Sequence, residues 1–355
     1  MSAENIVARF DRHIEVVTTE TAGMKETGFG SVETCRRVFE VLQGRYRRVE
    51  FNKVGNERDL REIVSRKPDL VVLCVKYVAD KEDGAKTWLS EYFSRHDVPH
   101  TGSSRAALEF DSDKSKAKRI LLGRGVATAK FFLGRPGRYL DEGQLPLPLP
   151  LFVKPMDAAN GNGVDENSLV HDFDSYRAKV EEIFAIYGVP ALVEEFLPGR
   201  EFTVSVLDDP GNRSLSVFPV EIVAPRNATG DRVLGHQAKS RNSEKLSMVE
   251  EPALSAVSAL AKEVFAVLGM RDFGRIDVKM DAHGLPHFIE TNLVPGMTPE
   301  TGYFPRACAI NSEMTYESVI LKIAELALKR AGRPSGHVLK AAETQQREPL
   351  AVVAT

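Results

Sequence analysis

Two short strands in the last third of the chain constrain its fold most. The segment 274–305 reads GRIDVKMDAHGLPHFIETNLVPGMTPETGYFP, and MDAHGLP within it predicts the turn of a hairpin. Alternate residues of a strand point to the same face, so Arg275 and Asp277 share a face, as do Glu290 and Asn292. A chain that needs only a core would place Val, Ile or Thr at such positions. The hairpin therefore predicts four polar side chains gathered on one patch.

These four side chains suit a site for metal ions and phosphate. Mg²⁺ prefers oxygen ligands, takes few of them from the protein, and keeps positions for phosphate oxygens. Asp277, Glu290 and Asn292 supply two carboxylates and one amide oxygen, and Glu290 could bridge two ions in a two-metal clamp. Mn²⁺ stays open as an alternative ion. The other interpretation is a surface hairpin with solvated charges.

The first hundred residues alternate between strand and helix patterns. Residues 13–19 and 46–51 read as strands, and 68–75, an apolar run, as a central parallel strand covered on both faces. Residues 31–44, which open with Ser31, and the segment 56–67 read as capped helices. This alternation predicts a doubly wound α/β unit.

The rest of the chain mixes helices with antiparallel strands. Helices are expected over 111–125, 173–188 and 253–269, and strands over 151–155, 190–196, 201–209 and 214–223. We therefore expect an N-terminal α/β domain (1–110), a central subdomain (111–200) and a C-terminal catalytic subdomain (201–332). Residues 333–355 lack a pattern and are expected to form a mobile tail.

Composition excludes several classes of protein. The net charge is −3 with both signs mixed, so the chain shows no electrostatic footprint for nucleic acid or an anionic membrane. Cys35, Cys74 and Cys308 are far apart and odd in number, which argues against a disulfide framework or a structural zinc site. The start lacks a secretory signal, and no apolar window of about 18 residues exists. A cytoplasmic protein is expected.

An ordered set of motifs carries a family resemblance. DK at 113–114, VKP at 153–155 with the glycine-rich loop after it, VEEFLPGREFTV, GRIDV and ETNLVPGMT follow in that order. The chain resembles the ATP-grasp superfamily, and within it the D-alanine–D-alanine ligase family, over roughly residues 13–330. The resemblance implies a doubly wound N-terminal domain followed by an ATP-grasp fold of two subdomains. It also implies an ATP-dependent carboxylate–amine ligase that works through an acylphosphate and releases ADP and phosphate.

The resemblance implies roles for individual residues. Some would contact ATP through phosphate, adenine or ribose, and Lys239, on a mobile loop, would reach the γ-phosphate. Asp277, Glu290 and Asn292 correspond to the ligands of two Mg²⁺ ions. Arg275 and the backbone of Gly296 correspond to groups that stabilise the acylphosphate and the tetrahedral intermediate. The ATP contacts are Lys114, Lys154, Asn160, Gly161, Glu194, Glu195, Leu197 and Glu201.

The substrate pocket departs from the family pattern. The implied substrate residues are Glu33, Lys76, Arg275, Gly296 and Thr301, with Glu33 also placed among the catalytic groups. Lys76 stands where the family carries histidine, and a permanent cation there would favour a substrate with an additional carboxylate. The alternative is a Lys76 that points to solvent.

Three functions stay open beside the general carboxylate–amine ligase that joins two amino acids. They are D-alanine–D-alanine ligase proper, an ATP-grasp phosphotransferase that forms no amide, and a nucleotide-binding protein without turnover. The intact cluster around Asp277 and Glu290 argues against the last. Segments 156–168 and 224–248 are expected to close over ATP. The expected partners are small-molecule carboxylates and amines, and a homodimer is left open.

Overall fold

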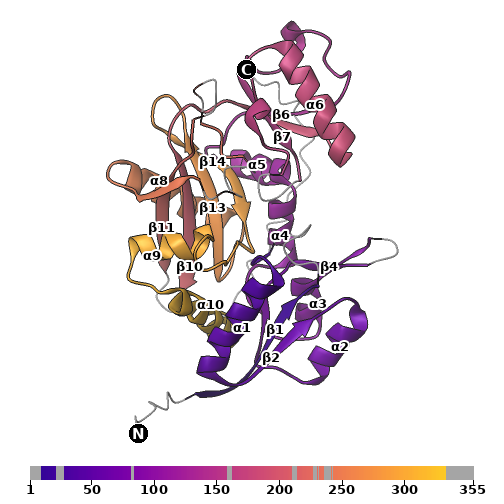
Figure 1. Cartoon of the computed structure of the whole chain (residues 1–355), viewed down its shortest axis with the longest axis vertical. Coiled ribbons are helices and arrows are strands. Elements are labelled where there is room, and N and C mark those ends of the chain that lie inside the picture. Colours follow the sequence, from indigo (N-terminus) through magenta and orange to yellow (C-terminus); the bar gives the residue numbers. More distant parts are fainter. Residues whose placement is uncertain are drawn as a thin grey trace.

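The computed structural model describes residues 9–20, 28–80, 84–157, 162–209, 214–226, 230, 232–235, 241 and 243–332 of the 355-residue chain. Three larger sheets are built from successive stretches of the sequence. Figure 1 shows the first at the bottom of the molecule, the second near the top beside α6, and the third between them on the left. The expected domain limits near residues 110 and 200 stay a prediction.

The N-terminal sheet is parallel and has the order β2–β1–β3. Its strands are β1 (Phe10–Thr18), β2 (Tyr46–Lys53) and β3 (Leu70–Leu73). The apolar run 68–75 contains β3, which is parallel and buried as expected, although β1 rather than β3 lies between the two other named strands. The outer edge of β3 meets a single bridge from Val71 to His100, which keeps its backbone groups paired.

Helices cover this sheet where the sequence predicts them. Ser31 caps α1 (Val32–Arg45) by accepting from the backbone N–H of Thr34. Asn56 and Asp59 form a capping box at the start of α2 (Glu57–Ser65). A short hairpin, β4 (Tyr77–Ala79) and β5 (Lys86–Trp88), precedes α3 (Leu89–Arg95). Local capping chemistry thus sets where these helices begin.

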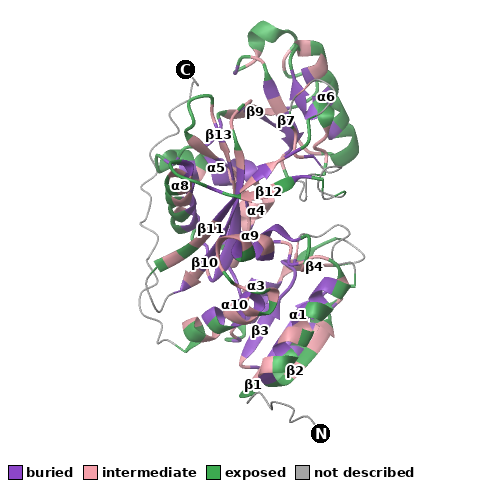
Figure 2. Ribbon diagram, turned by 60° about the vertical axis from the view of Figure 1, so that its left-hand side comes forward, coloured by how far each residue is buried: buried purple, intermediate pink, exposed green. Residues whose placement is uncertain are grey.

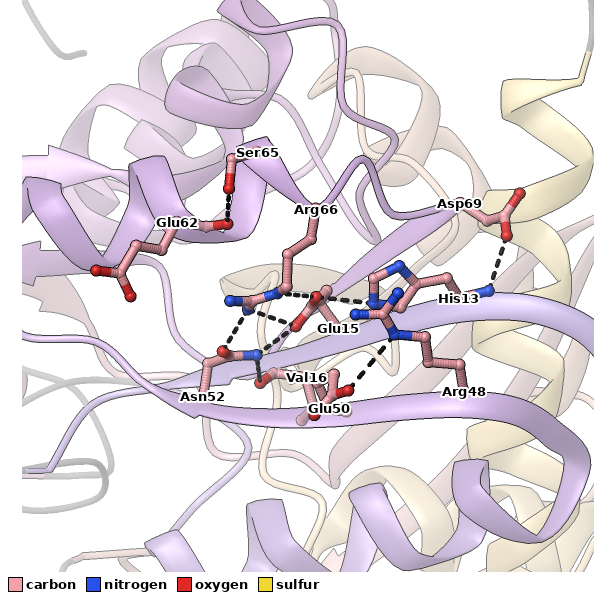
Figure 3. A network of polar contacts seen from close by, with 10 residues as sticks. All are labelled: His13, Glu15, Val16, Arg48, Glu50, Asn52, Glu62, Ser65, Arg66 and Asp69. Carbon is pink, nitrogen blue, oxygen red and sulfur yellow. Dashed lines mark hydrogen bonds and ion pairs between the residues drawn. The ribbon is translucent and has the colours of Figure 1, made fainter.

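A buried carboxylate fixes α2 to the sheet (Figure 3). Glu15, on β1, is fully buried, and Arg66 at the end of α2 donates to both of its oxygens, at 2.7 and 2.9 Å. Asn52 donates to the same carboxylate at 2.6 Å, and His13 Nε2 lies 2.9 Å from it. A buried charge requires such pairing, so this network has a structural role.

The central sheet is antiparallel and has the order β6–β9–β7–β8. Helix α4 (Arg105–Ser112) and helix α5 (Lys114–Gly123), capped by Asp113, lead into it. Helix α6 (Phe173–Tyr187) packs on it and ends at Gly188, whose positive φ of 69° suits glycine. The strands are β6 (Phe131–Gly134), β7 (Leu151–Pro155), β8 (Leu169–Val170) and β9 (Ala191–Glu195), with short helical turns at Glu142–Gln144 and Glu166–Ser168.

The C-terminal sheet is antiparallel and has the order β12–β11–β10–β13–β14. It carries the deepest part of the core, which Figure 2 shows as a buried band through the centre. Three helices pack against it: α8 (Ala253–Val267), α9 (Tyr303–Asn311) and α10 (Tyr316–Ala331), the last of which also contacts α1. The strands are β10 (Glu201–Asp209), β11 (Ser214–Val223), β12 (Lys245–Met248), β13 (Phe273–Met280) and β14 (Pro286–Asn292).

Two further findings concern the chain as a whole. Cys35, Cys74 and Cys308 are buried and free. Across the described ranges, no helix is both long enough and apolar enough to cross a membrane.

One ion pair, between Arg330 and Asp272, joins the N-terminal and C-terminal parts of the chain. Asp272 is 2% exposed, adopts a left-handed φ of 61°, and accepts from the backbone N–H of Gly102 at 2.7 Å. Arg330 of α10 donates to both oxygens of Asp272 and to the backbone carbonyl of His100. The His100 ring is also buried here. Its Nε2 lies 3.0 Å from the hydroxyl of Ser94, and its Nδ1 lies 3.1 Å from the backbone carbonyl of Thr101.

His100 predicts that the fold loses stability in mild acid. Burial lowers the pKa of His100 from 6.5 to about 4. Between these values the unfolded chain binds a proton that the folded chain does not, so the free energy of unfolding falls as the pH falls. A shift of this size corresponds to about 3 kcal/mol over the whole window. Urea unfolding at pH 7 and pH 4.5 should show a smaller loss for His100→Gln than for the native chain. An exposed control, His171→Gln, should behave like the native chain; an equal loss in all three proteins would contradict the prediction.

Candidate active site

The hairpin formed by β13 and β14 brings the four polar side chains together. Asp277 pairs with Glu290 and Arg275 with Asn292 in the register of the two strands. The amide of Asn292 lies 3.5 Å from the carboxylate of Asp277. A bulge at Ile289 interrupts the register, and both Ile289 and Glu290 line one cavity. Strict alternation would have placed them on opposite faces, so the bulge re-aims one side chain.

Asp277 is held on two sides. Arg275 donates to both of its oxygens at 3.0 Å in a bidentate ion pair, and Thr203 on β10 donates to one of them at 2.6 Å. Burial works against the charge of Arg275, but Asp277 outweighs it and raises the pKa of the guanidinium. The pair is therefore a fixed cation and a fixed anion at one point of the sheet.

The oxygen ligands expected for a metal ion lie on the two strands of this hairpin. Asp277 and Glu290 lie opposite each other, and the amide nitrogen of Asn292 faces Asp277. Lys114 Nζ lies 3.6 Å from Glu290, close enough to balance this acid or a phosphate. Among the described residues no group of three His, Cys, Asp or Glu could hold a metal. Two carboxylates and an amide suit Mg²⁺, which needs few protein ligands.

One cavity between the central and C-terminal sheets gathers six of the eight residues predicted to contact ATP and two of the three predicted metal ligands. Apolar side chains, among them Phe152, Phe196 and Ile289, form part of its wall. Glu201 pairs with Lys279 across the cavity edge at 3.0 Å, and Glu195 accepts from the backbone N–H of Lys130 at 2.8 Å. The sequence-predicted residues on the wall are Lys114, Lys154, Glu194, Glu195, Leu197, Glu201, Asp277 and Glu290.

A buried triad at one end of the cavity contains a residue that the sequence analysis missed. Glu194 is 3% exposed, with Lys154 at 2.8 Å from one carboxylate oxygen and Lys118 at 2.6 Å from the other. Burial opposes ionisation of Glu194, but the two lysines lower its pKa. The spacing of Lys118 from Lys114, one helical turn on α5, is the signal that could have found it.

Among the other expected substrate residues, Gly296 belongs to a loop that reaches the N-terminal part of the chain. The backbone N–H of Met297 donates to the carbonyl of Phe29 at 2.7 Å, so the loop after β14 packs against the start of α1. Gly296 faces open space, since an added Cβ would meet no atom within 4 Å. Thr301 is exposed before α9, and Glu33 is exposed in the first turn of α1. Their substrate roles stay predictions.

Lys76 is buried and paired with an acid. Its side chain is 3% exposed, so the alternative that it points to solvent is wrong. Its ammonium lies 3.1 Å from Asp111, whose other oxygen accepts from the backbone N–H of Leu293, directly after Asn292. A substrate carboxylate would have to compete with Asp111 for this cation, and the role of Lys76 in substrate selection stays a prediction.

Three predicted residues cannot be placed. Asn160 and Gly161 of the glycine-rich loop and Lys239 of the second loop lie outside the described residues. The expected closure of 156–168 and 224–248 over ATP concerns partly the same residues and stays a prediction.

The chain matches a family model over more than half of its length. Residues 116–325 match the model of the family described as "D-ala D-ala ligase C-terminus". A D-alanine–D-alanine ligase of Pelotomaculum thermopropionicum is 32% identical over 71% of this chain and 78% of its own length. The chain belongs to the D-alanine–D-alanine ligase family.

Other relatives extend the match beyond the catalytic part. A D-alanine–D-alanine ligase of Methylacidiphilum infernorum is 26% identical over 90% of this chain and 96% of its own length. The crystal structure of the Bacillus anthracis D-alanine–D-alanine ligase complexed with ATP superposes with a TM-score of 0.69 at 21% identity, covering 90% and 98% of the two chains. The fold is thus that of the family, with the ATP-grasp arrangement. The protein is an ATP-dependent ligase that joins a carboxylate to an amine.

Proposed function

We propose that this member of the D-alanine–D-alanine ligase family joins two amino acids, and that the cavity between the central and C-terminal sheets binds ATP with Mg²⁺. The observation that carries the proposal is the shared cavity of Lys114, Lys154, Asp277 and Glu290. Two lysines and two carboxylates at one cavity can bind phosphates and the cations that neutralise them. The relatives are named as ligases of D-alanine. The amino acids that this chain joins are to be identified by experiment.

The nucleotide would lie with its base against the apolar wall. Phe152 and Leu197 flank the cavity, and the backbone at the end of β9 and just after it, at Phe196 and Leu197, would contact the purine. Glu201 is placed to accept from ribose hydroxyls, with Lys279 neutralising its charge. Lys114 and Lys154 then face the phosphates, with Lys114 next to Glu290.

Asp277, Glu290 and Asn292 would hold the metal ions. Bound Mg²⁺ would neutralise charge that develops on the transferred phosphate. The protein's own contribution is positional: it holds two anions that repel each other in reacting geometry.

The reaction has two steps. A carboxylate oxygen of the first amino acid attacks the γ-phosphorus of ATP, which gives an acylphosphate and ADP. The amine nitrogen of the second amino acid then attacks the acyl carbon, loses a proton, and expels phosphate. Arg275, fixed by Asp277, would face the negative charge that forms on the acyl oxygen, together with the open backbone at Gly296.

A mixture assay tests the proposal. The enzyme is incubated with ATP, Mg²⁺ and pooled amino acids, with D- and L-pools kept separate, while phosphate and new masses are followed. We expect phosphate release only when a carboxylate and an amine are both present, together with a dipeptide mass. Phosphate transfer without any amide would identify a phosphotransferase and contradict the proposal. A product of two D-alanines would identify D-alanine–D-alanine ligase proper.

A homodimer and a cytoplasmic location stay predictions.

A further inference from the structure

A buried cation joins the two sheets on either side of the proposed ATP site. Lys118, on α5, is fully buried and does not line the cavity. Its ammonium lies 2.6 Å from Glu194 on β9 of the central sheet. It also donates to Thr128 at 2.8 Å and to the backbone carbonyl of Phe288, on β14 of the C-terminal sheet, at 3.3 Å. Lys118 thus contacts both sheets that form the cavity, but it does not line the cavity itself.

At the central sheet, Lys118 acts on a residue that faces the cavity. Glu194 divides its carboxylate between Lys118 on one oxygen and Lys154 on the other. Both Glu194 and Lys154 line the cavity. The position of Lys154, a proposed phosphate contact, therefore depends on a carboxylate that Lys118 holds from behind.

At the C-terminal sheet, Lys118 acts on the strand of the proposed metal ligands. Phe288 is followed by the bulged Ile289 and then by Glu290. Thr128 donates its hydroxyl to the carbonyl of Phe288 at 2.8 Å, and the two residues form a parallel bridge. The Lys118–Thr128–Phe288 contacts thus hold β14 at the point where the bulge turns Glu290 toward the cavity.

Stability alone gives no reason for a lysine in this place. Burial lowers the pKa of Lys118, which reflects the cost of holding a charge without water. Replacing buried ion pairs by apolar residues of similar volume is often neutral or stabilising. Buried polar networks specify a single arrangement of the groups that they join. Lys118 makes three such contacts: to Glu194 on the central sheet, to Phe288 on the C-terminal sheet, and to Thr128 in the segment before β6. These contacts form a buried polar network of this kind.

We propose that Lys118 is a positioning residue that sets the spacing between the Glu194–Lys154 pair and the Glu290 segment of β14, and thereby couples nucleotide binding to metal binding. The proposal rests on the proposed function for the identity of the two ligands, ATP and Mg²⁺. It does not depend on the amino-acid substrates.

The test measures binding of a non-hydrolysable ATP analogue by calorimetry, once with EDTA and once with Mg²⁺. Lys118→Met keeps the length of the side chain and removes its charge. We expect it to weaken analogue binding in EDTA about tenfold and to reduce the gain in affinity from Mg²⁺ by a further factor of about ten, within the usual range of coupling between sites. Lys116→Met, a half-exposed lysine on the same helix, is the matched control and should change neither value.

A second variant separates the two ends of the network. Thr128→Val keeps both charges and removes the hydroxyl that links Lys118 to β14. It should leave analogue binding in EDTA within about threefold of the native value and reduce only the gain from Mg²⁺. A merely structural role would lower the unfolding temperature of both variants and leave both binding constants unchanged below that temperature, which would overturn the proposal. If Lys118→Met does not fold, an unchanged Mg²⁺ gain in Thr128→Val overturns it alone.

The outcome is independent of the ligase assay. Failure to find any amide product would refute the proposed amino-acid chemistry while these binding constants still decide the role of Lys118. Native protein that binds the analogue without any gain from Mg²⁺ would overturn both the metal assignment and the coupling.

Discussion

Glu290→Gln should lower turnover at least about a hundredfold while leaving the affinity for ATP within about tenfold of the native value. The substitution keeps the shape of the side chain and removes the carboxylate proposed to hold the metal ions, so it would remove charge neutralisation needed mainly in the transition state. The apolar wall, Glu201, Lys114 and Lys154 remain to bind the nucleotide. Steady-state kinetics at saturating Mg²⁺ give kcat, and calorimetry with an ATP analogue gives the affinity.

Glu221→Gln is the matched control for this experiment. Glu221 lies on β11 of the same sheet, pairs with Arg200 at 2.7 Å, and does not line the cavity. Its replacement should leave kcat within about twofold of the native value, because this ion pair does not reach the cavity. Substantial activity of Glu290→Gln with Mg²⁺ would refute the two-metal assignment.

Glu194→Gln should lower the free energy of unfolding by about 3–5 kcal/mol, because it leaves the buried ammonium groups of Lys118 and Lys154 without their shared anion. Adding Lys118→Met to Glu194→Gln removes one of these unpaired charges and should restore part of the loss. Urea unfolding of the native chain and the two variants measures both effects.

An exposed glutamate supplies the control for stability. Glu263, on α8, is exposed, and Glu263→Gln should change the free energy of unfolding by less than about 0.5 kcal/mol. The role of the triad is contradicted if Glu194→Gln is as stable as this control, or if the double variant is less stable than Glu194→Gln alone.

Features that depend on neighbouring residues could be predicted from the sequence. Ser31 and Asn56 begin helices because their side chains accept from backbone N–H groups two or three residues on. The pairing of Asp277 with Glu290 follows from strand alternation and a short turn. The family resemblance added the roles of the lysines around the cavity.

Features that depend on distant residues could not be predicted. The place of β3 at the edge of its sheet is set by how the connecting helices cross the sheet, which no local pattern records. The bulge at Ile289 adds one residue to a strand whose alternation looks regular in the sequence. A lysine reads as exposed by default, yet Lys76 and Lys118 are both buried, because acids distant in sequence pair with them.

The sequence by itself therefore determined several of the helices and strands, the strand pair with its acids, and the family, since these rest on spacings of a few residues. Only the tertiary structure decided which charges are free to act. Asp111 neutralises Lys76, and Glu194 divides its charge between Lys118 and Lys154, because the packing of distant segments brings each lysine within 3.1 Å of its acid. At such distances in a buried setting, pairing rather than residue type fixes what a charged side chain can do.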